Sequence, residues 1–379
     1  MLKSSKIVGT TFFIFTLAII FSVLGKFQVS SIPKLFDYSF FNLLTLVILV
    51  QAVTQTFKVN QYDKKVLKLV SSISGDIRYS MVVPPIIFGL LPMPAGAMLT
   101  AELTRTAGES LGARKKWIFF FNYWFRHVCE FSWPLYGALI LAAGIAGIPL
   151  KNFILATLLY FTIAVIIGLV LIFVKVKPNG NKERIKIQPK EILLNLLSAL
   201  TPVILIIVMI FLKIDLKYSL LIVLALLFLL EKTRLSDILK TLKLSVFSDI
   251  TLIVLVVLLF KGIVENTDTL NAFARFLTSH KVPQIIPVII LPMIMAFLTG
   301  ITSAGIGSTA PILQGLFALN PAFPYLAYIS AITGVLISPF HLCFITTKEY
   351  FKVSFKEVYA TITVPILLIQ LVAILKALL

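Results

Sequence analysis

Apolar runs of about twenty residues recur along this chain and limit what it can fold into. The runs at 7–24, 152–174 and 192–212 each have roughly the length that a helix needs to cross ~30 Å of hydrocarbon. The first run has a basic start but no small-residue cleavage site after it, so we interpret it as a retained span. Together the runs predict nine spans, at 7–25, 39–57, 117–148, 152–174, 192–212, 216–230, 245–264, 322–345 and 357–379. The predicted fold is an all-α polytopic membrane protein.

Composition agrees, with 59% hydrophobic and 13% charged residues. A net charge of +18 would suggest nucleic acid as the partner of a soluble chain, but basic loops that orient membrane spans explain it better. Most of the 34 basic residues fall in cytoplasmic loops if the N-terminus is cytoplasmic. We therefore expect a multi-pass protein of the plasma (inner) membrane with that orientation, in contact with lipids and not with nucleic acid.

Two apolar stretches, 81–106 and 283–318, are crowded with Pro and Gly, and we call them the first and second interrupted stretches. Pro removes a backbone donor and Gly lets the chain leave a helix, so neither stretch is expected to be one continuous helix. At membrane depth the freed backbone groups need protein, water, ions or substrate as partners. We interpret each stretch as a re-entrant helical hairpin, with 298–311 as the turn of the second. Kinked spans or interfacial helices are the alternative.

The order of segments predicts an inverted repeat. Residues 88–105 align with 296–313, and a Ser-Pro break follows each, at 130–136 and 336–342. We divide the chain into a first repeat with its hairpin, a cytoplasmic loop and connector helix, and a second repeat with its hairpin. Their boundaries are 1–175, 176–215 and 216–379.

The segment 122–134 holds ionisable side chains inside a predicted span. Asn122, Arg126 and Glu130 are spaced i, i+4, i+8, so they are expected to share one helix face, with His127 beside them. Ionisable groups within a span are costly and are functional candidates. Arg126 suits an anionic substrate; if it pairs with Glu130, it would only lock the broken span. Glu102 and Arg105 can form a separate pair at i, i+3.

Three familiar catalytic and metal-site motifs are missing from the sequence. Neither HExxH, a Walker loop nor CxxC occurs, and the three His and two Cys are dispersed, which argues against an enzyme and against a metal site. Both cysteines, Cys129 and Cys343, are expected to be buried thiols. The only cofactor expected is a coupling ion, Na⁺ or H⁺.

Four motifs resemble one family. They are PxxxGLLPMPAGAML at 85–99, YWFRHVCEFSWPLY at 123–136, GITSAGIGSTAPIL at 300–313 and SPFHLCFITTKEYFK at 338–352. Together they are similar to domain of unknown function family 401, grouped with the ion transporter superfamily. The resemblance implies an elevator-type secondary transporter with a re-entrant hairpin in each repeat, often a dimer, that moves small organic anions with sodium or protons.

Our hypothesis is therefore an ion-coupled transporter of a small carboxylate-like anion, with a homodimer as its expected assembly. The predicted substrate-binding residues are Pro94, Ala95, Gly96, Thr100, Asn122, Arg126, Thr302, Ser303, Gly305, Ser308, Thr309, Ser338 and His341. The predicted ion-coupling residues are Gly96, His127, Glu130, Ser132, Gly300, Gly305 and Ser338. An ion channel or channel-like exporter, an intramembrane enzyme and a non-transporting subunit remain as alternatives.

Overall fold

The computed structural model describes residues 27–60, 77–90, 96–177 and 214–379, and parts of 14–22 and 201–212. These residues form helices and no strands, as the sequence predicts for an all-α protein. Three predicted segments lie partly or wholly outside the described residues. They are most of the first span, the loop from 178 to 190, and the start of the 192–212 span.

The helices, in chain order, are η1 (Val29–Leu35), α2 (Tyr38–Val59), η2 (Ile77–Met81), α4 (Val83–Gly89), α5 (Gly96–Ser110), α6 (Lys115–His127), η3 (Val128–Phe131), α7 (Gly137–Ile145), α8 (Leu150–Lys175), α10 (Leu216–Leu230), α11 (Leu235–Val246), α12 (Asp249–Glu265), α13 (Thr269–Ser279), α14 (Ile285–Thr299), α15 (Thr302–Phe317), α16 (Phe323–Leu336), α17 (Leu342–Phe351) and α18 (Phe355–Leu378). The three η elements are 3₁₀ helices.

Three of the described helices, α2, α8 and α18, are long and apolar enough to cross a membrane. Helices α11 and α12, bent by 42° at their junction, would make a fourth span. Leu155, Ile166 and Val170 of α8 are about half exposed, as expected for side chains that face lipid rather than water. These helices indicate a membrane location, while the count of nine spans stays a prediction.

The first interrupted stretch contains two separate helices, α4 and α5. Pro84 and Pro85 lie in the first turn of α4, where a helix does not need their missing N–H groups. Helix α4 ends at Gly89, and both helices pack against α6. A Cβ at Gly89 would lie only 2.9 Å from the carbonyl oxygen of Arg126, so glycine permits this close approach of α4 to α6.

The second interrupted stretch is a pair of helices, α14 and α15, that pack against each other. Gly300 ends α14 with φ 68°, a left-handed conformation that glycine adopts at low cost. The expectation that all of 298–311 forms the turn is wrong, because α15 already begins at Thr302. Gly305 lies inside α15, where an added Cβ would meet the Cβ of Ala296 at 2.5 Å, so it serves close helix packing.

The two Ser-Pro breaks predicted from sequence are present. After α6 the chain forms the short 3₁₀ helix η3 and then resumes as α7 at Gly137. In the same way α16 ends at Leu336 and α17 begins at Leu342. Each break contains a proline, Pro134 or Pro339, which has no N–H to donate the hydrogen bond that would continue the helix.

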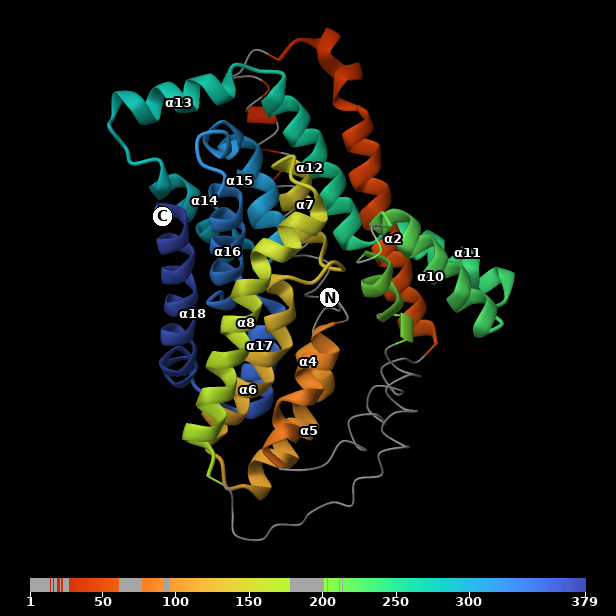
Figure 1. The fold of residues 1–379 in the computed structure, drawn as a ribbon, viewed down its shortest axis with the longest axis vertical. Coiled ribbons are helices and arrows are strands. Elements are labelled where there is room, and N and C mark those ends of the chain that lie inside the picture. The colour runs from red at the N-terminus through yellow and green to blue at the C-terminus, as the bar shows by residue number, and fades with distance from the viewer. Residues whose placement is uncertain are drawn as a thin grey trace.

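The N-terminal and C-terminal parts of the chain interlock. Figure 1 shows α4 and α5 in the lower part of the molecule and α14 and α15 in the upper part. Helix α15 packs against α7, and α5 packs against α17. The two interrupted stretches thus lie in opposite parts of the molecule, and each contacts helices from the other part of the chain (Figure 1).

Candidate functional site

Arg126 connects the broken helix to the first interrupted stretch. Its guanidinium Nη1 donates a 2.8 Å hydrogen bond to the hydroxyl of Tyr136. That hydroxyl donates in turn to the carbonyl oxygen of Gly89, the last residue of α4, at 2.9 Å. Beside it, Nε1 of Trp133 donates to the carbonyl of Leu90 at 2.9 Å. The carbonyls that α4 leaves without helical partners are therefore bound by side chains of the α6–α7 break.

Glu130 connects the same break to the second interrupted stretch. Its side-chain carboxylate accepts a hydrogen bond from the hydroxyl of Thr302, the first residue of α15. Its backbone carbonyl accepts a 2.6 Å bond from the hydroxyl of Tyr328 on α16. The start of a helix carries partial positive charge, so α15 favours a negative group at this place. A buried carboxylate of the protein occupies it here.

The predicted shared face of Asn122, Arg126 and Glu130 is wrong for Glu130. Helix α6 ends at His127, and Glu130 belongs to the 3₁₀ helix η3, which turns with 3.0 rather than 3.6 residues per turn. The change of pitch turns Glu130 toward Thr302, while Arg126 reaches Tyr136. Glu130 thus contacts the second interrupted stretch, whereas Arg126 is linked to the first through Tyr136.

Asn122 binds the exit helix of the first interrupted stretch. Its Oδ1 accepts hydrogen bonds from the hydroxyls of Thr100 at 2.7 Å and Thr104 at 3.1 Å. Its Nδ2 donates to the carbonyl of Ala97 at 2.9 Å. All four residues are buried. The predicted site residues Thr100 and Asn122 are thus brought together, as a link between α5 and α6.

His127 and His341 meet, although 214 positions separate them. Their Nε2 atoms lie 3.0 Å apart. The Nδ1 of His127 contacts the carbonyl of Tyr123 at 2.6 Å, and the Nδ1 of His341 contacts the carbonyl of Gly300 at 2.9 Å. The sulfur of Cys343 completes a group in which all three ligand atoms lie within 4.8 Å of one another, close enough to hold a metal ion. The His and Cys residues are dispersed along the chain, but folding brings these three together.

The hydroxyls of the second interrupted stretch divide into two kinds. Thr302 reaches another segment, whereas Ser308 and Thr309 each bond back to their own helix, at 2.8 Å to the carbonyls of Ala304 and Gly305. Bonds of this kind satisfy the hydroxyl within α15 and leave the backbone helical. Ser303 is buried in the same first turn as Thr302.

The remaining predicted residues lie at helix ends or outside the described residues. Gly96 is the first residue of α5. Ser338 donates its hydroxyl hydrogen to the carbonyl of Phe297, near the end of α14. Pro94 and Ala95 lie outside the described residues.

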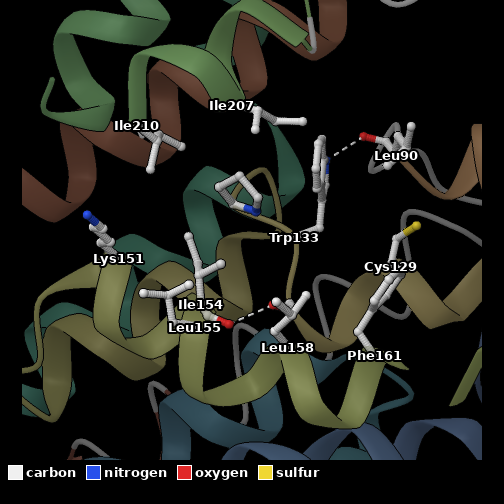
Figure 2. A pocket seen from close by; sticks show the side chains of 12 residues that line it. Leu90, Cys129, Trp133, Lys151, Ile154, Leu155, Leu158, Phe161, Ile207 and Ile210 are labelled. Carbon is white, nitrogen blue, oxygen red and sulfur yellow. Dashed lines mark hydrogen bonds between the residues drawn. The ribbon is translucent and has the colours of Figure 1, made fainter. Parts of the chain in front are cut away.

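Ser132 borders a cavity of about 230 Å³ between the break and α8. Its hydroxyl donates to the carbonyl of Ile154 at 2.8 Å. Figure 2 shows the Trp133–Leu90 bond at the same cavity. The cavity is lined mainly by apolar side chains, with Lys151 at its edge (Figure 2). Leu155 and Leu158, two of these, are about half exposed. Because burying a charge in apolar surroundings is costly, this lining suits hydrocarbon better than a carboxylate.

Three residues of the site were missed by sequence reasoning. Tyr136 and Tyr328 are ordinary aromatics in an apolar sequence, where nothing distinguishes a hydrogen-bonding tyrosine from a packing one. For Cys343 the sequence held a weak hint, because the pattern His-x-Cys occurs at both breaks, at 127–129 and 341–343. Only the second thiol joins the histidines; Cys129 faces the carbonyl of Ile86 at 3.6 Å.

The chain matches a protein-family model over nearly its whole length. The model of the family described as "Protein of unknown function (DUF401)" covers residues 2–379. No curated protein matches the chain.

Proposed function

The chain belongs to the DUF401 family, and we propose that it is a secondary active transporter of a small organic anion, coupled to sodium ions or protons. One observation carries the proposal. Within five residues of a broken helix, Arg126 reaches the first interrupted stretch through Tyr136, and Glu130 reaches the second through Thr302. A buried anion therefore contacts the start of one interrupted helix directly, and a buried cation is linked to the end of another through Tyr136; transporters use charged groups at such helix ends for substrate and ion.

Arg126 is the residue that we assign to the anion. It is 3% exposed, and a guanidinium offers several donors in a planar fork that matches a carboxylate. The substrate class is therefore a small carboxylate-like anion.

Glu130 is the residue that we assign to coupling. Its carboxylate accepts a hydrogen bond at the start of α15, where the helix carries partial positive charge. A substrate carboxylate would also be favoured at this place. Two anions at one helix end repel each other, so substrate entry requires a cation beside Glu130 or movement of its side chain. That competition links the anion to a sodium ion or proton. It also gives α15 two states, one bound to Glu130 and one bound to substrate.

The mechanism that we propose is elevator-type alternating access by inverted repeats. The opposite placement of α4–α5 and α14–α15, and the matching breaks after α6 and α16, support it (Figure 1). A unit that bears both interrupted stretches would move against a scaffold that includes the long helices and a homodimer contact. The proposed setting is the plasma membrane with a cytoplasmic N-terminus.

A two-stage experiment tests this function. A thermal-shift screen of small anions on the detergent-purified protein, with and without sodium and at two pH values, identifies ligands that bind the folded state. Hits are then followed as labelled substrates in proteoliposomes under a sodium or a pH gradient. We expect saturable uptake that shows counterflow and that Arg126→Gln abolishes.

The matched control is Arg275→Gln, which removes an arginine whose side chain is 66% exposed and pairs with Asp268. This variant should transport normally. Non-saturable flux without counterflow would instead indicate a channel, and equal uptake by Arg126→Gln and the control would remove Arg126 from the site.

A further inference from the structure

The side chains of His127, His341 and Cys343 form a group that the proposed transport does not require, and we call it the His–His–Cys cluster. His127 ends α6, His341 precedes α17, and Cys343 lies in the first turn of α17. His127 is 3% exposed and Cys343 is 5% exposed. Each residue offers one ligand atom, and the three atoms lie within 4.8 Å of one another.

The hydrogen bonds of the two imidazoles determine where their lone pairs lie. Nδ1 of His127 faces the carbonyl oxygen of Tyr123, and Nδ1 of His341 faces that of Gly300. A carbonyl oxygen only accepts hydrogen bonds, so both Nδ1 atoms carry the hydrogen. In a neutral imidazole the lone pair is then on Nε2.

Two lone pairs consequently face each other across the 3.0 Å between the Nε2 atoms. Such a contact is repulsive unless a cation lies between the nitrogens or beside both of them. The cation can be a proton shared by the two rings or a metal ion bound by both. Tetrahedral bonds of about 2.0–2.1 Å from one metal to two nitrogens would place those nitrogens a little over 3 Å apart, close to the observed contact.

Cys343 favours the metal ion. A shared proton needs only two nitrogens, whereas a thiolate is a third ligand for a borderline-soft metal and offsets part of its charge. The carbonyl partners of both Nδ1 atoms also match the usual environment of metal-binding histidines, which donate their second N–H to a carbonyl or carboxylate. The donor set of two nitrogens and one sulfur does not suit Ca²⁺ or Mg²⁺, which bind oxygen.

We propose that the His–His–Cys cluster binds one zinc-class transition-metal ion through both Nε2 atoms and the Cys343 sulfur. Three protein ligands leave a fourth tetrahedral position for water or another small ligand. Because His341 also binds the carbonyl of Gly300, the ion would join the turn of the second interrupted stretch to the end of α6. The ion would thus hold the turn of the second interrupted stretch in a fixed position relative to the end of α6.

Cobalt binding to the full-length protein tests this proposal. The chain is purified in detergent, treated with a chelator, and titrated with Co²⁺, which replaces Zn²⁺ in such sites and absorbs visible light. We expect one Co²⁺ per chain, a sulfur-to-cobalt charge-transfer band, and loss of both signals when Zn²⁺ is added. Cys343→Ser should remove the charge-transfer band and weaken Zn²⁺ binding at least about tenfold.

Cys129→Ser and His280→Gln are the matched controls, because one changes the other buried cysteine and one an exposed histidine. Both should bind cobalt as the unmodified chain does. His127→Gln and His341→Gln should each bind more weakly, provided that the variant elutes as a single species. A chain that binds no cobalt, as expected if the two rings only share a proton, would overturn the proposal. So would a charge-transfer band that survives Cys343→Ser.

Discussion

The hydroxyl of Thr302 donates a hydrogen bond to the side-chain carboxylate of Glu130, a residue 172 positions earlier in the chain. Thr302 opens α15, and Glu130 lies in the 3₁₀ turn that follows α6. The bond joins the second interrupted stretch to the broken helix of the first part of the chain. Both side chains are buried, so little water is present to replace the bond if it is lost.

Replacing Thr302 by Val should therefore destabilise the protein. The two side chains have similar shape, but Val leaves the buried Glu130 carboxylate without this donor, at a cost of about 1–3 kcal/mol. Thermal unfolding in detergent measures the loss. Thr309→Val is the control, since that hydroxyl bonds only within α15 among the described contacts, and its loss should be smaller. Equal destabilisation of the two variants would contradict the role given to the Thr302–Glu130 bond.

Replacing Gly305 by alanine should destabilise the folded protein. An added Cβ would approach the Cβ and backbone of Ala296 within 3 Å, and backbone cannot yield as a flexible side chain does. Separating α14 from α15 should cost about 1–3 kcal/mol, as overpacking usually does. Thermal unfolding of Gly305→Ala measures it.

Gly315→Ala provides the comparison within the same helix. Apart from its chain neighbours and the nearby backbone of its own helix, no atom lies within 4 Å of a Cβ placed there, so the change should be neutral or stabilising by about 0.5–1 kcal/mol through helix propensity. If Gly305→Ala is as stable as Gly315→Ala, the result would contradict the conclusion that α14 packs too closely on Gly305 to admit a Cβ.

Glu102 should make stability depend on pH. Hydrogen bonds from Arg105 and then from Tyr350 lower the pKa of this exposed carboxyl below its ordinary value of 4.5. A lowered pKa in the folded state means that the carboxylate stabilises the fold above the unfolded pKa. This contribution is lost as pH falls through the folded pKa. The unmodified chain should therefore be more stable than Glu102→Gln at neutral pH and lose that advantage below pH 4.5.

Thermal unfolding of both proteins over a pH series tests this expectation. Glu109→Gln is the control, because Glu109 lies 3.9 Å from Arg105 and makes the weaker pairing. A Glu102→Gln variant whose difference from the unmodified chain does not change with pH would show that the α5–α17 contact does not depend on this carboxylate.

Cysteine labelling tests the predicted orientation in the membrane. Cys129 and Cys343 are buried, so a single introduced cysteine should dominate the reaction with a membrane-impermeant maleimide. Ser279→Cys, in the segment 266–281, should react in intact cells. Lys177→Cys, at the start of the 175–190 loop, should react only after permeabilisation. The reverse pattern would contradict a cytoplasmic N-terminus.

Much of the helical layout could be predicted from sequence because its causes are local. Apolar runs predicted α2, α8 and α18, and the pairing of Glu102 with Arg105 at i, i+3 is confirmed at 2.6 Å. The Ser-Pro breaks were also predicted correctly. The extent of the second turn was not, because a glycine such as Gly305 has the same identity whether it ends a helix or allows another helix to approach.

The sequence by itself determined that this chain is helical and apolar, and where its helices break, since length, Pro and Gly act within a few residues. Tertiary structure alone decided that Glu130 contacts the second interrupted stretch while Arg126 is linked to the first through Tyr136, and that His127 meets His341 and Cys343. These contacts join segments up to 214 positions apart. Their partners depend on how helices pack and on one 3₁₀ turn that rotates Glu130 off the α6 face, which local residue patterns do not specify.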